Sequence, residues 1–404
     1  MRIARLGLLI ALVALLSSVA LAGHTIEDAL RALAAQGDPG PRWTFIVAAD
    51  VRHFMPIVPS PVFERAVAEF NVLRPDLVVV IGDLIFGYTD DAAQLRRMWD
   101  AYFDVVERCR VPLFSVVGNH DVSKPLHEDL WKELVGPMYY SFTYGNALFL
   151  CLASDEAAHP GTISVDREQW VAAQLEAHRN ARHVFIFVHQ PLFLGGPQTR
   201  WNAIHDLLKR HPAPNKVCFA GHQHVYTLLP ERDGVRYVIT GGGGSEIGPL
   251  PEAGDFHHYL LVTVRGDDVR WAVIKTGAVE PEDTVTEAQA GQVRRLAAGI
   301  GSLRAAAGDE PGLVKLTLPI SNETDQALRA SLKWEGLAYC DELEPSAVSV
   351  SVPPGEAREL AFTLRARDPD KALTGLNCVV TVIFGDAQKS FTVRRPARKM
   401  QTGG

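Results

Sequence analysis

Residue types that bind metal ions occur in short segments of this sequence, and each segment follows an apolar run typical of a buried strand. The segments are Asp50-Val51-Arg52-His53, Gly82-Asp83, Gly118-Asn119-His120-Asp121, Val188-His189-Gln190 and Gly221-His222-Gln223-His224. Because the carboxyl ends of strands gather at one edge of an α/β sheet, we expect these segments to meet there. Carboxylate, amide and imidazole ligands together suit Fe, Mn or Zn ions better than Ca or Mg. The sequence therefore predicts a metal centre at a sheet edge.

The elements that must position these segments alternate between strand and helix. Apolar runs predict strands at residues 43–49, 77–81, 112–117, 184–188 and 216–220. Helical spacing and capping residues predict helices from Pro61 toward Arg74, over 95–106 and over 166–178. Further strands at 237–240, 259–264 and 269–274 make the second half of this region rich in β structure. The pattern predicts an α/β sandwich.

The remainder of the chain has a different pattern. Residues 280–300 are polar and rich in alanine, which favours a helix or a linker. Short strands at 312–320, 327–334, 347–352, 359–365 and 378–384 are separated by turn residues and predict a C-terminal all-β, immunoglobulin-like domain. We therefore divide the chain into residues 1–22, 23–42, 43–278, 279–311 and 312–404. These are a signal peptide, an N-terminal helix with its lead-in, the metal-binding domain, a helical linker and the β-sandwich.

The first residues predict export. Arg2 and Arg5 precede an apolar run over residues 6–16, and Ala20-Leu21-Ala22 offers a signal-peptidase site. The run is too short to cross a bilayer stably, so we expect a mature chain that begins near Gly23 in the periplasm or outside the cell. An uncleaved N-terminal anchor is the alternative. No later segment is long and apolar enough to span a membrane, so we expect no span after cleavage.

Composition narrows the classes of partner. With 404 residues and 47% hydrophobic composition, the chain can bury a large core. Its net charge of -7 gives no basic footprint for nucleic acid, so affinity for phosphate must come from a local cluster of metals and cations. Of the five cysteines, Cys340 and Cys378 form the pair that an oxidising compartment would permit to bridge.

The order of the five segments resembles that of the calcineurin-like metallophosphoesterase superfamily, over about residues 43–275. This resemblance implies a four-layer α/β/β/α sandwich and two divalent or trivalent metal ions, with Fe, Mn and Zn as candidates. It implies that Asp83 bridges both metals. The other implied ligands are Asn119, His189 and His222 at one metal, and Asp50 and His224 at the second.

The resemblance also implies a reaction. A hydroxide bridging the two metals attacks the phosphorus of a phosphate mono- or diester in line. His120 then stabilises or protonates the leaving oxygen, and Asp121 orients the imidazole of His120. The competing hypothesis is a metallophosphoesterase-like protein that has lost activity and binds a protein partner through its β-sandwich.

One position departs from the family pattern. Family members usually read Asp-x-His at the first strand end, whereas this chain has Arg52 there and a histidine one residue later, at His53. Because side chains alternate direction in extended backbone, we expect Arg52 to take the site-facing position unless a bulge re-aims His53. A guanidinium cannot bind a metal, but it can grip a phosphate oxygen and supply fixed positive charge.

Three further features leave their roles open. Residues 241–244 are four glycines that either bring backbone amides to a phosphate or form a flexible loop. Asn322-Glu323-Thr324 is a glycosylation sequon. The β-sandwich contributes no residue to the metal segments, so we expect a chain ending near Gln292 to keep most of its turnover.

Overall fold

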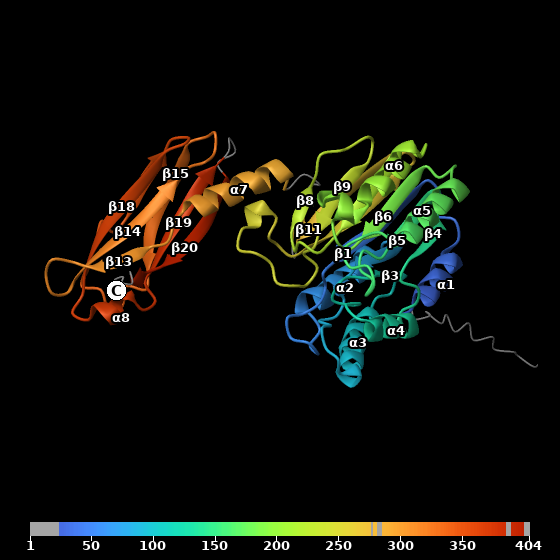
Figure 1. The fold of residues 1–404 in the computed structure, drawn as a ribbon, viewed down its shortest axis with the longest axis horizontal. Helices are drawn as coiled ribbons and strands as arrows, with labels where there is room; N and C mark the ends of the chain where they lie inside the picture. Colours follow the sequence, from blue (N-terminus) through green and yellow to red (C-terminus); the bar gives the residue numbers. More distant parts are fainter. Residues whose placement is uncertain (1–23, 276–277, 281–284, 385–388, 400–404) are drawn as a thin grey trace, which may run out of the picture.

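A computed structural model describes residues 24–275, 278–280, 285–384 and 389–399, and it places them in two lobes joined by helix α7 (Glu287–Gly299) (Figure 1). The predicted signal segment, residues 1–22, lies outside these residues. Within the described ranges, no helix is both long and apolar enough to cross a membrane.

The catalytic lobe, residues 24–280, contains a sheet with the strand order β12-β11-β10-β1-β2-β3. The strands are β1 (Arg42–Ala49), β2 (Leu77–Ile81), β3 (Leu113–Val116), β10 (His258–Arg265), β11 (Asp268–Lys275) and β12 (Ala278–Glu280). The first three are parallel, and the last three join them by antiparallel pairing. Every residue of β2 is buried, as expected for a parallel strand covered on both faces.

The second sheet of this lobe has the order β4-β5-β6-β7-β9-β8. Its strands are β4 (Tyr140–Tyr144), β5 (Ala147–Leu152), β6 (His183–Val188), β7 (Asn215–Ala220), β8 (Tyr226–Leu228) and β9 (Arg236–Thr240). Alternate residues face opposite sides. Phe149 and Phe185 point at Phe45 of the first sheet, with ring centroids 5.4 and 4.8 Å apart from it. The residues that alternate with them along β5 and β6 face the helices instead. The two sheets are therefore joined face to face by an aromatic core.

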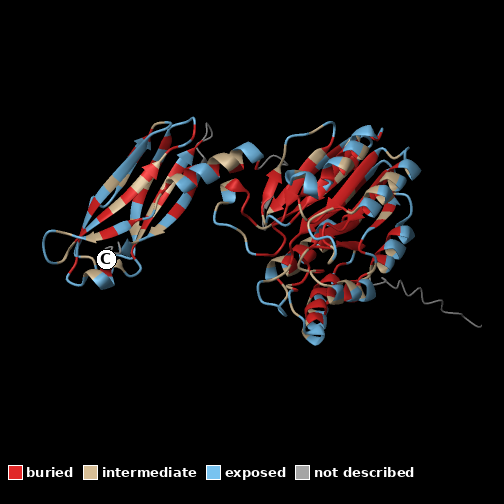
Figure 2. Cartoon of the chain, viewed as in Figure 1, coloured by how far each residue is buried: buried red, intermediate tan, exposed pale blue. Residues whose placement is uncertain are grey.

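Helices cover the outer face of each sheet (Figures 1 and 2). On the first sheet, Phe70 of α2 (Pro61–Leu73) packs edge-on against Tyr259 with ring centroids 5.0 Å apart, and Tyr102 of α3 (Ala92–Val106) hydrogen-bonds Ser115 at 3.0 Å. On the second sheet, α5 (Val165–Ala177) and α6 (Trp201–Arg210) share a separate apolar cluster with residues such as Ile186. The layers thus run helix, sheet, sheet, helix. Helices α1 (Ile26–Gln36) and α4 (Pro125–Leu134) lie beside them.

The C-terminal lobe, residues 304–399, is a β-rich region, and its described strands form two sheets, in the orders β16-β18-β14-β13-β21 and β17-β15-β19-β20. The elements are β13 (Arg304–Ala307), β14 (Leu313–Ser321), β15 (Leu328–Glu335), β16 (Glu342–Glu344), β17 (Val348–Val352), β18 (Ala357–Arg365), α8 (Pro369–Leu373), β19 (Asn377–Phe384), β20 (Lys389–Pro396) and β21 (Arg398–Lys399). A β-rich C-terminal region is therefore confirmed, while its immunoglobulin-like type stays a prediction.

Helix α7 is packed rather than solvated. Val293 and Leu296 are buried, and Arg294 of the same helix donates to the carbonyl of Ala253 at 3.3 Å and lies 3.7 Å from Asp255. A chain ending near Gln292 would cut this helix in its middle and expose its buried face. The end point expected from the sequence therefore falls inside a packed helix, and a cut that spares the helix must follow Gly299.

The sequon is sealed inside the C-terminal lobe. The Asn322 side chain is buried, and its Nδ2 donates to the carbonyls of Gln326 and Val352 at 2.8 Å each. Its Oδ1 accepts from the amide and the hydroxyl of Thr324, at 3.1 and 2.7 Å. The nitrogen that would carry a glycan is therefore inaccessible in the folded chain.

The cysteines are free. All of them lie within the described ranges, and Cys378 is buried while Cys340 is partly exposed. The bridge that the sequence permits between these two is not formed.

Candidate metal centre

The predicted metal ligands all lie at the carboxyl ends of strands, where the two sheets of the catalytic lobe meet. Three follow strands of the first sheet and three lie next to strands of the second. They are Asp50 after β1, Asp83 after β2, Asn119 after β3, His189 after β6, His222 after β7 and His224 before β8. We call this place the metal edge. The face-to-face sheets thus bring carboxylates and an amide from one side against imidazoles from the other.

A buried group at the metal edge has the composition of a metal site. Among the described residues, Asp50, Asp83 and His189 each offer a ligand atom, and these atoms lie within 4.8 Å of one another. His189 Nε2 lies 3.0 Å from Asp83 Oδ1. Because two carboxylates buried this closely repel each other, a cation between them would remove a large electrostatic cost.

Asn119 and His222 join this group from the exposed side. Asn119 Oδ1 lies 3.1 Å from His189 Nε2 and 3.0 Å from His222 Nδ1. The amide oxygen therefore sits between two imidazole nitrogens and close to the carboxylates. Such a convergence of oxygen and nitrogen atoms suits Fe, Mn or Zn ions.

Backbone carbonyls contact the Nδ1 atoms of two of the imidazoles. His189 Nδ1 lies 3.2 Å from the carbonyl of Ile81, and His224 Nδ1 lies 2.7 Å from that of Glu246. A carbonyl only accepts, so each Nδ1 carries a proton, and Nε2 is the nitrogen whose lone pair a metal ion could use once Nε2 is deprotonated. His224 Nε2 lies 3.4 Å from Asp50 Oδ1. Such backing is typical of histidines that ligate a metal.

An unpartnered oxygen tests whether a metal ion fits. Asp50 Oδ2 accepts from the His222 amide at 2.8 Å, but the buried Oδ1 of Asp50 has no hydrogen-bond partner in the described structure. His224 Nε2 lies 3.4 Å from this oxygen without forming a hydrogen bond, and native proteins rarely leave a buried carboxylate oxygen in that condition without a reason. The residues present therefore fit a metal ion that takes this oxygen as a ligand.

Asp83 and His189 at the metal edge stabilise each other's charged forms. Burial opposes the charged form of His189, but Asp83 and Asp50 outweigh it and raise the pKa of His189 to about 10. Burial also opposes the charged form of Asp83, yet His189 and His120 hold the pKa of Asp83 well below its usual range. A metal ion entering here would therefore displace a proton from His189.

The metal edge is strained. Four of the predicted ligands have left-handed backbone: Asp50 (φ 58), Asp83 (φ 53), His222 (φ 69) and His224 (φ 41). Each such non-glycine residue costs on the order of 1–3 kcal/mol and persists only where the surroundings fix it. The motif spacing gave no sign of this strain.

Glycines precede two of these ligands because no larger residue fits. A Cβ on Gly82 (φ 63) would overlap the His189 ring, and one on Gly221 would overlap the Asp50 carboxylate. The glycines of the Gly-Asp and Gly-His segments thus let ligands from separate strands approach one another.

Arg52 faces the metal edge and His53 turns away. Arg52 Nε lies 3.8 Å from Asp83 Oδ2, its Nη1 lies 3.5 Å from Glu246, and its side chain is 10% exposed. His53 Nδ1 instead accepts from the Met55 amide at 3.0 Å. The alternation argument behind this expectation is wrong, because β1 ends at Ala49 and the chain turns at Asp50 rather than continuing as a strand.

His120 is oriented by a backbone carbonyl, not by Asp121. His120 Nδ1 lies 2.6 Å from the carbonyl of Phe86, and its Nε2 points to Asp83 Oδ2 at 3.7 Å. Asp121 Oδ2 accepts from the Gly118 amide at 2.8 Å and its Oδ1 accepts from the Leu84 amide at 2.9 Å. The expected role of Asp121 is therefore wrong. Both of its oxygens tie the loops after β2 and β3 together.

The buried position of Asp121 also affects its charge. Burial, with Asp83 adding to it, raises the pKa of Asp121 to about 8, while amide donation from Gly118 acts in the opposite direction. A cation at the metal edge would offset the charge of Asp83 and favour the ionised form that these amides bind.

Two residues of the metal edge were missed in the sequence. Tyr88 accepts from Asn119 Nδ2 at 2.7 Å through its hydroxyl. Glu246 pairs with Arg52 through its side chain and holds His224 through its carbonyl. Both lie in loops at no fixed spacing from the motif segments, so only the fold reveals them.

The four glycines at 241–244 form a buried strap. The amide of Gly241 donates to Val225 at 2.9 Å, that of Gly243 to Ala49 at 2.8 Å, and that of Ser245 to Asp50 at 2.8 Å. A Cβ on Gly243 would overlap the carbonyl of Ala49. The flexible-loop reading is therefore wrong, and the amides of Gly241 and Gly243 in this glycine strap are already engaged and cannot bind a phosphate.

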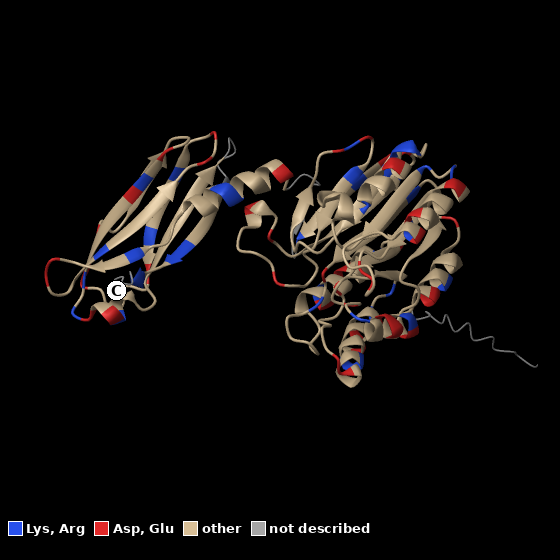
Figure 3. Cartoon of the chain, viewed as in Figure 1, with Lys and Arg blue, Asp and Glu red and all other residues tan. Residues whose placement is uncertain are grey.

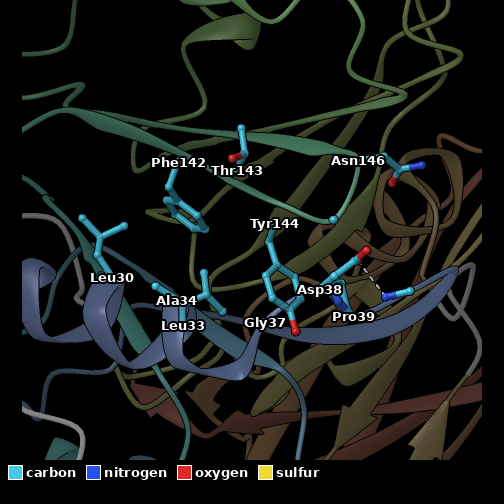
Figure 4. Close-up of a pocket in the computed structure, with 12 residues that line it drawn as sticks. Leu30, Leu33, Ala34, Gly37, Asp38, Pro39, Phe142, Thr143, Tyr144 and Asn146 are labelled. Atoms are coloured by element: carbon cyan, nitrogen blue, oxygen red, sulfur yellow. Dashed lines mark hydrogen bonds between the residues drawn. The ribbon is translucent and has the colours of Figure 1, made fainter.

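A hollow elsewhere in the lobe is not the site. It has a volume of about 730 Å³ and lies between the end of α1, residues 37–40 and the β4–β5 hairpin (Figure 4). Since these residues precede β1 and β5, the hollow lies at the amino ends of the strands, opposite the metal edge.

Outside the buried groups, charges of both signs are interspersed over the helices (Figure 3).

Comparisons with known proteins match the part of the chain that contains this centre. Residues 44–226 match the family model of the calcineurin-like phosphoesterases. A bovine (Bos taurus) serine/threonine-protein phosphatase CPPED1 is 30% identical over 233 residues, which cover 51% of this chain and 70% of that protein. The zebrafish (Danio rerio) protein of the same name is 27% identical over 228 residues, covering 51% of this chain and 71% of it.

Solved structures include a dimetal phosphatase from Danio rerio. It aligns with a TM-score of 0.45 and 17% identity, over 59% of this chain and 96% of that one.

Proposed function

The chain belongs to the calcineurin-like phosphoesterase family and is a metal-dependent phosphoesterase, and we propose that it hydrolyses phosphate mono- or diesters at the metal edge with two metal ions. The observation that carries this proposal is the buried group of Asp50, Asp83 and His189, whose ligand atoms lie within 4.8 Å of one another. The unpartnered Oδ1 of Asp50 supports it.

The predicted ligands divide into two sets in this proposal. Asn119, His189 and His222 would hold one ion and Asp50 and His224 the other, with Asp83 available as a ligand to both. When bound, two such ions lower the pKa of a shared water and neutralise phosphoryl oxygens. Fe, Mn and Zn fit the donor types.

Two cationic or titratable side chains act on the ester itself. Arg52 keeps its buried Nε without a hydrogen-bond partner and aims it toward Asp83, so the guanidinium is placed to grip a phosphate oxygen. His120 has its Nδ1 held by Phe86 and presents Nε2 to the same space, where it stabilises or protonates the leaving oxygen.

The test compares two esters and one variant. We expect p-nitrophenyl phosphate or bis-p-nitrophenyl phosphate to be hydrolysed with added Mn²⁺, and the turnover to be lost in His189→Ala. The relatives named serine/threonine-protein phosphatases support monoesters, including phosphoserine peptides, as the first to assay. Absence of turnover with both esters and with Mn²⁺, Fe²⁺ or Zn²⁺ would overturn the proposal and favour an inactive binding protein that uses its β-sandwich.

The proposal also includes export. Its support is the sequence pattern of Arg2, Arg5 and the apolar run over residues 6–16. Mass spectrometry of the protein recovered from its natural host should find a chain that begins near Gly23. An intact N-terminus on cytoplasmic protein would contradict export without affecting the proposed chemistry.

A further inference from the structure

The loop between β2 and α3 surrounds His120 with three consecutive residues. Phe86 offers its carbonyl to His120 Nδ1 at 2.6 Å. Gly87 (φ 64) lies so close to the His120 carbonyl that no Cβ fits there. The ring of Tyr88 stands edge-on to the imidazole with centroids 4.5 Å apart. The loop is therefore shaped around the residue that faces the leaving group.

This loop is fixed at its far end. Lys124 Nζ lies 2.6 Å from Asp90 Oδ1, and the ring of the buried His127 meets the carbonyl of Thr89 at 2.8 Å. Tyr88 itself has left-handed backbone (φ 49), which an ordinary side chain adopts only where its surroundings require it. The position of Tyr88 is thus defined by contacts on both sides.

The Tyr88 hydroxyl helps to hold the Asn119 amide at the metal edge. Asn119 Nδ2 donates to this hydroxyl at 2.7 Å, while Oδ1 lies between His189 and His222. Only the oxygen of an amide can bind a metal ion, because its nitrogen has no free lone pair. Without the hydroxyl, Nδ2 would lose the hydrogen bond that the described structure gives it, and the amide would be held less firmly.

The ring of Tyr88 remains open to solvent. It is 52% exposed and stands edge-on beside the imidazole of His120. Phe86 and His53 line one small cavity between the two loops. An aromatic ring at the mouth of a site stacks well on another aromatic group.

We propose that Tyr88 is both a positioning residue for Asn119 and a specificity-determining residue that favours phosphate esters of aromatic alcohols. The inference rests on the proposed function. Its two parts depend on different atoms of one side chain, so they can be separated by substitution.

The first variant, Tyr88→Phe, removes the hydroxyl and keeps the ring. After chelation, titration with Mn²⁺ followed by the electron paramagnetic resonance signal of the free ion should show one site weakened about 10-fold, as when a metal ligand loses its supporting partner. The ratio of kcat/KM for phenyl phosphate to that for β-glycerophosphate should stay at the wild-type value. Unchanged Mn²⁺ affinity would overturn the positioning role.

The second variant, Tyr88→Leu, removes the ring as well. We expect the same loss of Mn²⁺ affinity and a fall of about 5-fold in the phenyl-to-glycerol ratio, the size of a lost aromatic contact. With saturating Mn²⁺ the change should appear in KM for phenyl phosphate rather than in kcat. An unchanged ratio would overturn the specificity role. Tyr339→Leu, at a 61% exposed tyrosine of the C-terminal lobe, is the matched control and should change neither quantity.

The outcomes also separate this inference from the function on which it rests. Absence of turnover by the wild-type protein on both esters would count against the phosphoesterase proposal, while the Mn²⁺ titration of Tyr88→Phe would still test the positioning role. Active wild-type protein with two silent variants would leave the function standing and reject the inference.

Discussion

The metal edge and the C-terminal lobe accommodate buried polar groups in opposite ways. At the metal edge, four predicted ligands have left-handed backbone, and Asp50 Oδ1 and Arg52 Nε are buried without hydrogen-bond partners. Among the described residues of the C-terminal lobe, no non-glycine residue has a positive φ. The buried polar side chains described in this lobe, Asn322 and Thr324, form hydrogen bonds with each other and with nearby carbonyls.

This difference shows where the fold stores backbone strain. Such strain persists only where the surrounding structure fixes it, and it is typical of sites that bind ligands. Among the described residues, four of the eight non-glycine residues with positive φ are predicted ligands, and none lies in the C-terminal lobe.

The largest effect should follow from removing the charge of Asp83. Asp83→Asn keeps a residue that tolerates the left-handed backbone, but it deletes the proposed shared ligand. We expect kcat to fall by roughly 10³-fold with Mn²⁺ present, as when a main electrostatic contact to the transition state is lost. The metal-free variant should also melt below the wild-type temperature, because the substitution leaves the buried, charged His189 without its partner at 3.0 Å. An unchanged melting temperature would show that this pair does not stabilise the fold.

In the C-terminal lobe we expect a loss of stability without a loss of turnover. Asn322→Ala removes four hydrogen bonds from a buried turn and should lower the free energy of unfolding of that lobe by about 3 kcal/mol. Turnover at low temperature should not change, since no residue of this lobe belongs to the metal edge. Asn377→Ala, which loses one exposed hydrogen bond to Gly375, is the control and should cost less than about 0.5 kcal/mol. Equal losses in the two variants would contradict the assignment.

A smaller effect is expected on metal affinity, which substitution of Arg52 should change and substitution of His53 should not. Because Arg52 stands where family members usually have a histidine ligand, the ion that we propose for Asp50 and His224 should be the more weakly bound of the two. Arg52→His should strengthen it by about 10-fold in a titration of chelated protein, as an added supporting or ligating imidazole would. His53→Ala is the control and should change neither affinity, because its Nδ1 is engaged by Met55. Loss of an ion in His53→Ala would mean that His53 swings into the site.

The smallest effect should come from deleting the C-terminal lobe. A chain ending after Ser302 keeps all of α7, and its turnover on p-nitrophenyl phosphate should stay within about 2-fold of the full-length value, because the cut removes no residue of the metal edge. A chain ending at Gln292 should lose stability, since it discards the buried Leu296 and the contact that Arg294 makes with Ala253. Equal behaviour of the two shortened chains would show that α7 is dispensable.

The sequence indicated the fold and the location of the metal edge well, because both depend on local patterns. The strand expected at residues 77–81 is β2, and the helix expected over 166–178 is α5, shifted by one residue. The order of the motif segments identified residues that the fold brings together. Short strands such as β16 (Glu342–Glu344) were missed because two of the three residues are charged.

What could not be predicted depends on contacts between distant backbone atoms. Asp121 binds amides 37 and 36 residues away as well as a near one, which the spacing in Gly-Asn-His-Asp cannot indicate. The turn at Asp50 removes the extended backbone on which the argument for Arg52 relied. Tyr88 carries no motif at all. In each case the fold chooses the hydrogen-bond partner, and the sequence supplies only the residue type.

The glycine strap has a consequence for the way mutations in this protein will be read. It offers no ligand and no proton, yet its amides brace Ala49 and the strand end next to Asp50, and a side chain on Gly243 has no room. In a saturation screen scored by activity, we expect residues 241–244 to be as intolerant as the histidines. A map of such sensitivity would therefore mark a stretch of inert backbone as if it were catalytic.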